Sequence, residues 1–94
     1  MTVNICGMPY EVVEVKDRFD SDLHFGDVDY KKCRIQINKD LAKEEKKETL
    51  CHEILHAMLL HIGQSELSQD ETLVQSLGNA IYQTFELKGA VWET

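Results

Sequence analysis

Several features that define whole classes of protein are scarce or missing in this chain of 94 residues. It has one proline, and no apolar run approaches the roughly 20 residues that span a bilayer. No basic segment leads into an apolar stretch near the N-terminus, so we expect neither a membrane span nor a secretory signal peptide. The short length predicts a single domain over residues 1–94.

The cysteines are too few and too irregularly spaced to form a disulfide framework. Cys6, Cys33 and Cys51 are odd in number and contain no C-x-x-C spacing. Reduced thiols that pack as small hydrophobic side chains are the simpler interpretation. They indicate a reducing, cytoplasmic location.

Basic residues are outnumbered, with 10 Lys and Arg against 17 Asp and Glu and a formal net charge of −7. This balance disfavours nonspecific binding to nucleic acid or to an anionic membrane. Most of the basic residues nevertheless fall between positions 31 and 47. A solvated strand edge and helix start explains that grouping, and a cradle for an acidic partner is the weaker alternative.

The first third of the chain carries the signals of β-structure. A hairpin is predicted by three signals: alternation around residues 3–5, a turn at Gly7-Met8-Pro9 and a β-branched run over 10–15. The polar stretch 17–29 predicts a loop, and renewed alternation over 33–37 predicts a third strand.

Helical spacing of apolar residues follows the strands. One helix is predicted from Lys43 to a stop at Gly63. A second is predicted to run from Ser68, as its N-cap, to Lys88-Gly89, before a tail that carries Trp92. Strands followed by helices predict an α+β fold: a small antiparallel sheet of about three strands on the first helix, with the second helix behind.

The first predicted helix contains the motif H-E-x-x-H, at His52-Glu53-Ile54-Leu55-His56. Residues four apart lie about 40° apart around a helix, so both imidazoles share one face, which suits zinc. Glu53 lies about 100° from His52, beside the metal, where it can take a proton from water. The clean apolar face beside the motif disfavours the alternative that these histidines merely occupy the edge of the core.

A zinc site needs a third protein ligand, and His61 is the first candidate to consider. It lies about 140° around the helix from His56, which places it on a different face. The metzincin pattern H-E-x-x-H-x-x-G-x-x-H is also absent. We therefore predict that His61 is an exposed or boundary residue of the last helical turn.

Glu71, at the start of the second predicted helix, is our choice of third ligand. It would complete a His-His-Glu set that leaves one position open for water. A competing role is a capping box with Ser68, in which Glu71 bonds the backbone of the cap. Asp70 and then Glu66 are the reserve candidates for the ligand.

Other polar residues have weaker claims to a role in catalysis. Tyr82 returns to the helix face of Glu71, where it would stabilise a developing oxyanion, but a core aromatic is favoured. Tyr30 and His24 fall in or near the long loop, where plain exposure is expected. Thr49, one turn before the motif, either supports the site or lies on the helix surface.

The segments Thr49 to Ala57 and Asp70 to Asn79 together resemble a known group. They are similar to small zincin-like metallopeptidases of phages and prophages of Gram-positive bacteria, which are distantly related to the ImmA/IrrE peptidases. Those proteins tend to read T-L-x-H-E-x-x-H-A and then E-x-x-V-x-x-L-A-N. Here Gly78 stands in place of the usual alanine.

The resemblance implies a minimal zincin fold and a zinc-dependent peptidase in the cytoplasm of a bacterial host. It implies that His52, His56 and Glu71 bind the metal and that Glu53 is the catalytic base. A protein or peptide substrate would then extend along the strand around residues 35–37, treated as a sheet edge. The alternative is a non-catalytic, zinc-stabilised regulatory module that binds a host protein, because so short a chain leaves little material for a substrate cleft.

Overall fold

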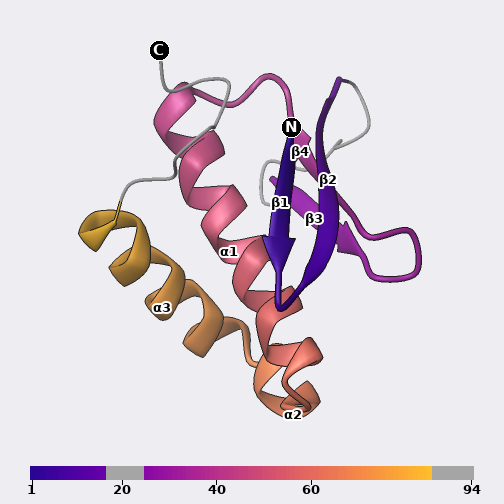
Figure 1. Cartoon of the computed structure of the whole chain (residues 1–94). Helices are drawn as coiled ribbons and strands as arrows, with labels where there is room; N and C mark the ends of the chain where they lie inside the picture. Colours follow the sequence, from indigo (N-terminus) through magenta and orange to yellow (C-terminus); the bar gives the residue numbers. More distant parts are fainter. Residues whose placement is uncertain (17–24, 86–94) are drawn as a thin grey trace.

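The computed structural model describes residues 1–16 and 25–85, and it confirms the predicted α+β class (Figure 1). The predicted helix end at Lys88-Gly89 and the tail with Trp92 lie outside these residues. In chain order the elements are β1 (Thr2–Ile5), β2 (Met8–Val15), β3 (Gly26–Asp29), β4 (Arg34–Asn38), α1 (Lys43–His61), α2 (Ser65–Ser68) and α3 (Glu71–Thr84).

The sheet is four-stranded and mixed, with the order β1-β2-β4-β3. The β1–β2 pair is antiparallel, which confirms the predicted hairpin, whereas β2 and β4 are parallel and β3 and β4 are antiparallel. The loop prediction is wrong over Gly26–Asp29, which forms β3. Its sequence, GDVD, contains a single apolar residue and therefore carries no alternation to reveal a strand.

The extra strand changes which part of the sheet is an edge. β4 lies between β2 and β3 and pairs with both, so the expectation that residues 35–37 form a free edge is wrong. β3 is an edge strand of the sheet, and it is the edge that lies beside the motif on α1. An extended peptide that adds to the sheet beside the motif would therefore meet β3.

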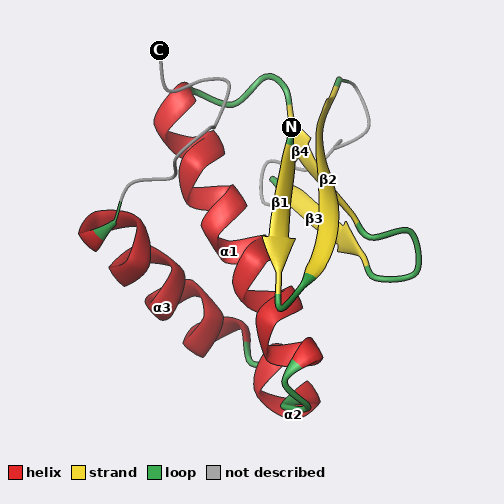
Figure 2. Ribbon diagram, viewed as in Figure 1, coloured by secondary structure: helices red, strands yellow, loops and turns green. Residues whose placement is uncertain are grey.

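The core lies between the sheet and α1, and α3 packs on the other side of α1 (Figure 2). Ile35 and Ile37 alternate along β4 and are fully buried, as are Tyr10 of β2 and Leu50 of α1. This one-sided burial is what a sheet face and a helical stripe need to form a small core. Among the described residues, no helix combines the length and apolar character of a membrane span.

Gly26 lets β3 lie unusually close to α1. A Cβ at this position would come within 2.8 Å of both the Gln36 carbonyl oxygen and the Thr49 Cγ2 atom. Real Cβ atoms do not approach a backbone oxygen this closely, so only glycine fits without a shift of the backbone. The glycine thus fixes the narrow spacing between the edge strand and the motif helix.

The connection from α1 to α3 differs from the predicted one. A short helix, α2, intervenes, and Asp70 caps α3 by accepting a hydrogen bond from the Leu73 backbone N–H at 3.1 Å. The assignment of Ser68 as N-cap, and with it the capping box to Glu71, is therefore wrong. Ser68 is buried at the end of α2, and its hydroxyl donates to the His56 carbonyl oxygen at 2.8 Å.

Candidate metal centre

The two histidines of the motif point to a common place beside α1. Their Nε2 atoms are 3.1 Å apart, and the rings meet edge to face. His56 is buried and His52 is half-buried. The helical spacing of four residues accounts for this convergence without any help from the rest of the fold.

Glu71 completes the group from the first turn of α3. Its Oε2 atom lies 3.1 Å from His52 Nε2, and its Oε1 atom lies 3.1 Å from His56 Nε2. Among the described residues, these three form the group of His, Cys, Asp and Glu able to hold a metal ion, with ligand atoms all within 4.8 Å. The reserve candidates do not join it: Asp70 caps α3, and Glu66 is exposed on α2.

The donor set fits a zinc ion. Four atoms placed about 2.0–2.1 Å from a tetrahedral ion are about 3.3 Å from one another. The two Nε2 atoms are 3.1 Å apart, and each lies 3.1 Å from a different oxygen of Glu71. Two imidazoles and one carboxylate leave a fourth position for water, as in catalytic zinc sites. The geometry therefore agrees with the predicted ligand set, whose role as ligands remains a prediction.

The surroundings of His56 prepare it for this role. Its Nδ1 atom is 2.5 Å from the Ser68 carbonyl oxygen, which can only accept a hydrogen bond. Nδ1 must therefore carry the proton, and Nε2 keeps its lone pair toward Glu71 and His52. A bond of this kind to the outer nitrogen fixes the tautomer and orientation of a metal-binding imidazole.

His52 is also held in the neutral state that a metal requires. Burial lowers its pKa and the neighbouring His56 lowers it further, while Glu71 and Gln75 act in the opposite direction. Its Nε2 atom faces the cluster, but its Nδ1 atom is buried without a hydrogen-bond partner among the described residues. The two candidate ligands from α1 therefore differ in their hydrogen-bond support.

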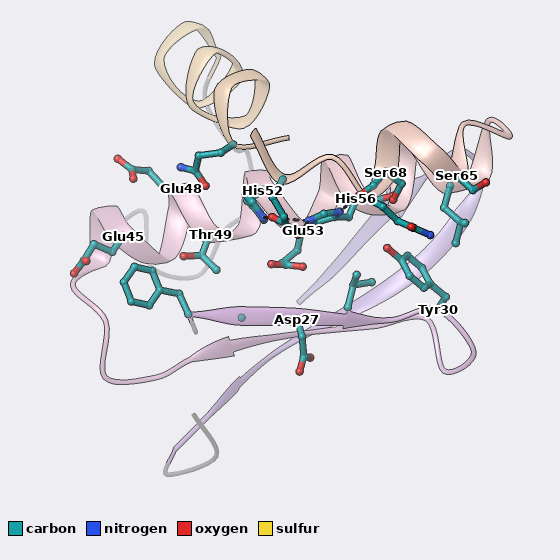
Figure 3. Close-up of a pocket in the computed structure, with 17 residues that line it drawn as sticks. Asp27, Tyr30, Glu45, Glu48, Thr49, His52, Glu53, His56, Ser65 and Ser68 are labelled. Atoms are coloured by element: carbon teal, nitrogen blue, oxygen red, sulfur yellow. Dashed lines mark hydrogen bonds and ion pairs between the residues drawn. The ribbon is translucent and has the colours of Figure 1, made fainter. Parts of the chain in front are cut away.

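Glu53 is set apart from the three converging residues. Its side chain is only 7% exposed, and its carboxylate points from α1 toward β3 (Figure 3). Burial, with smaller contributions from Asp27 and Glu71, raises the pKa of Glu53 to about 8. A carboxylate that binds a proton this readily near neutral pH is suited to proton transfer.

These residues line a cleft of about 790 Å³ between α1 and the end of the sheet. Phe25, β3 and the turn after it form one wall, and α1 and α2 form the other (Figure 3). Thr49 lines the cleft and is buried, so it is not a residue of the helix surface. The cleft supplies room for an extended chain beside the motif.

Tyr30, for which plain exposure was expected, is 36% exposed and also lines the cleft. It lies in the turn after β3, and its ring reaches into the cleft toward Ser68 (Figure 3). Burial raises its pKa, a hydrogen bond with Ser68 lowers it, and Glu53 and Glu71 raise it, which places the phenol near both carboxylates. Asp29 orders this turn by accepting bonds from two backbone N–H groups at 3.1 Å, a signal that the sequence did contain.

The other candidate residues lie elsewhere. His61 Nε2 is 2.7 Å from the Tyr10 hydroxyl, at the C-terminal end of α1, and is not part of the cluster. Tyr82 donates a hydrogen bond to Glu44 and does not line the cleft, so it is not placed to contact an oxyanion there. His24 lies outside the described residues.

Comparison with known proteins gives one match. A family model described as the SprT-like family matches residues 9–70, which is 62 of the 94 residues. The match includes β2 from its second residue, then β3, β4, the whole motif helix and the cap of α3. No curated protein and no solved structure matches the chain.

Proposed function

The chain belongs to the SprT-like family, a group of zincin-like metallopeptidase-related domains, and from this premise we propose that it is a zinc-dependent peptidase. The observation that carries the proposal is the position of Glu53. Its buried carboxylate opens into the same cleft as the three converging ligand atoms but is not one of them. A purely structural metal site has no need of such a group.

In this proposal His52, His56 and Glu71 hold the zinc ion. A bound zinc ion polarises a carbonyl group and makes water a nucleophile near neutral pH. This assignment is supported by the 3.1 Å between the two Nε2 atoms and the 3.1 Å from each of them to one oxygen of Glu71. The bond that leaves the His56 Nε2 lone pair free also supports it.

Glu53 is the proposed general base. It accepts a proton from the attacking water and later donates that proton to the amine that leaves. In the metal-free protein burial raises the pKa of Glu53, which makes its carboxylate a stronger base than an exposed one. Tyr30, across the cleft, is placed to donate a hydrogen bond to the oxygen on which negative charge develops.

The proposed substrate is an extended segment of a protein or peptide, paired with the edge strand β3. Gly26, Asp27 and Val28 of this strand line the cleft opposite the motif. Backbone pairing along a sheet edge binds an extended chain with little dependence on its sequence. A chain paired with β3 would then pass Glu53, which lines the same cleft.

The test is a cleavage screen with zinc-loaded protein and a peptide pool, read by mass spectrometry. Glu53→Gln keeps the shape of the side chain but removes the base, so turnover should fall by about 10²–10⁴ while zinc content stays the same. Glu66→Gln, which makes the same change on an exposed residue of α2, is the matched control and should retain activity. Full activity in zinc-loaded Glu53→Gln protein would refute the mechanism.

The same preparations test the ligand set. Glu71→Gln should weaken zinc binding, whereas Asp70→Asn and His61→Ala should not. If zinc binds wild-type protein with no peptide cleaved, the chain is better described as a zinc-stabilised binding module. The narrower resemblance to phage-encoded, ImmA/IrrE-related peptidases and the cytoplasmic location both remain predictions.

A further inference from the structure

The buried, unpartnered Nδ1 atom of His52 is the feature that the proposed mechanism does not use. A buried N–H group without an acceptor costs free energy, so its presence at a site calls for an explanation. His56 has no such deficit, because the Ser68 carbonyl oxygen accepts its Nδ1 proton. The two ligands on α1 therefore differ in a way that their shared motif does not predict.

The tautomer of His52 follows from its place in the cluster. Its Nε2 atom faces Glu71 at 3.1 Å and His56 at 3.1 Å, so Nε2 must be unprotonated to bind a cation there. A neutral imidazole has one proton, which then lies on Nδ1. In its metal-binding form His52 therefore needs a hydrogen-bond acceptor for Nδ1, the atom that has no such partner among the described residues.

The side chain placed to fill this need belongs to α3. Glu71, Gln75 and Asn79 are spaced by four residues and so share one face of that helix. Gln75 lines the cleft and acts on His52, whose pKa it raises. A Cβ at Gly78 would lie only 3.4 Å from the His52 Cα atom, so the two helices are close at this level.

Asn79 sets the orientation of the Gln75 amide. Gln75 Nε2 donates to Asn79 Oδ1 at 3.2 Å, and this oxygen can only accept. The amide nitrogen of Gln75 is thus committed to Asn79. Its other end, the Oε1 atom, remains available as an acceptor.

We propose that Gln75, oriented by Asn79, accepts the Nδ1 proton of His52 and thereby fixes the metal-binding tautomer of that ligand. Gln75 is a positioning residue, and this inference rests on the proposed zinc site. The two side chains line the same cleft, and a hydrogen-bond interaction with Gln75 already contributes to the pKa of His52. One face of α3 then supplies the third ligand, Glu71, and the support for the first, His52.

The test measures zinc affinity by competition with a chromophoric chelator for wild-type protein and three variants. Gln75→Leu removes the acceptor and should weaken binding by about 10–100-fold, as losses of outer hydrogen bonds to metal ligands do. Gln75→Glu keeps an acceptor oxygen and should retain affinity. Gln83→Leu, the same substitution at an exposed position of α3, should have no effect.

A second readout separates positioning from a general effect on the fold. Long-range ¹H–¹⁵N correlation spectra of zinc-loaded protein should show His52 protonated at Nδ1, with slow exchange of that proton in wild-type and Gln75→Glu protein. Exchange should become fast in Gln75→Leu, while His56 is unchanged. Unaltered affinity and exchange in folded Gln75→Leu would overturn the inference yet leave the zinc site intact, whereas a wild-type protein that binds no zinc would overturn both.

Discussion

The two faces of α1 are held by different kinds of interaction. On the sheet side, Leu50 and Ala57 are buried in the main core, and Gly26 brings β3 into close contact with Thr49. On the other side, α3 buries only Val74 and Gly78 among its described residues. The sheet side therefore carries the larger apolar core, whereas the α3 side adds the polar contacts around His52 and Glu71 to a smaller apolar contact.

This difference separates stability from function within one helix. The apolar face fixes where α1 lies and hence where His52 and His56 point. The α3 side supplies the proposed third ligand from a helix with only two fully buried residues among those described, Val74 and Gly78. We infer that zinc, by joining α1 to α3, adds to the smaller apolar contact that holds α3, and the following predictions test this contrast.

The largest expected effect is that of removing the metal. Zinc at about 1,000 times its Kd should stabilise the fold by about 4 kcal/mol, because the unfolded chain has no such site. Hydrogen–deuterium exchange with and without chelator should show the greatest loss of protection in α3 and a smaller change in β2 and β4. Equal loss in all elements, or identical melting midpoints for verified zinc-free and zinc-loaded protein, would contradict the contrast.

The second effect concerns the pH dependence of the metal-free protein. The pKa of Glu53 is about 8 when folded and near 4.5 when unfolded, so the folded chain holds a proton that the unfolded chain has lost. The stabilisation is complete below pH 4.5, falls as the pH rises, and is absent above pH 8. Between pH 5 and 7 the free energy of unfolding should fall by about 2–3 kcal/mol from this group alone, at about 1.4 kcal/mol per unit.

Glu53→Gln is the control, because glutamine does not titrate and resembles the protonated acid. Urea titrations in chelator at several pH values should show that the variant lacks this part of the slope. The two proteins should converge at low pH and diverge as the pH rises, with the variant the more stable. Parallel curves for the two proteins would show that the carboxylate is not buried as described.

The sequence predicted the apolar side of α1 and its motif better than what surrounds them. Spacing alone placed His52 and His56 on one face, and alternation found β1, β2 and β4, because these signals are local. β3 escaped detection because its pairing with β4, and not its own pattern, makes it a strand. Its position as the edge could not be read from sequence for the same reason.

The side of α1 that faces α3 shows more clearly which contacts the sequence could not predict. Glu71 was chosen as a ligand because it begins the next helix, but its distance to His52 depends on α2, which the sequence did not predict. Ser68 was predicted to cap the second helix, whereas it lies at the end of α2 and forms hydrogen bonds with His56. Tyr30 was expected only to be exposed, because its place beside the cleft with Glu53 exists only after the strands have paired.

The smallest expected effects come from a matched pair of alanine substitutions, one on each side of α1. At Gly26 an added Cβ would lie 2.8 Å from the Gln36 carbonyl oxygen, so Gly26→Ala must displace β3 and should cost about 1–3 kcal/mol. At Gly78 the closest contact would be 3.4 Å, to the His52 Cα atom, which is ordinary van der Waals contact. Gly78→Ala should therefore stabilise the protein by about 0.5–1 kcal/mol, because alanine is favoured over glycine inside a helix.

Urea denaturation of zinc-loaded protein measures both free energies, and zinc titration shows whether the site survives. Gly78→Ala should bind zinc as wild-type protein does, since its methyl group fits between the helices without moving His52 or Glu71. Gly26→Ala should also bind zinc, because the ligands lie on α1 and α3, but it should impair any peptide binding along β3. A destabilised Gly78→Ala with weakened zinc binding would mean that α3 sits as tightly on α1 as the sheet does, and the contrast between the two faces would then fail.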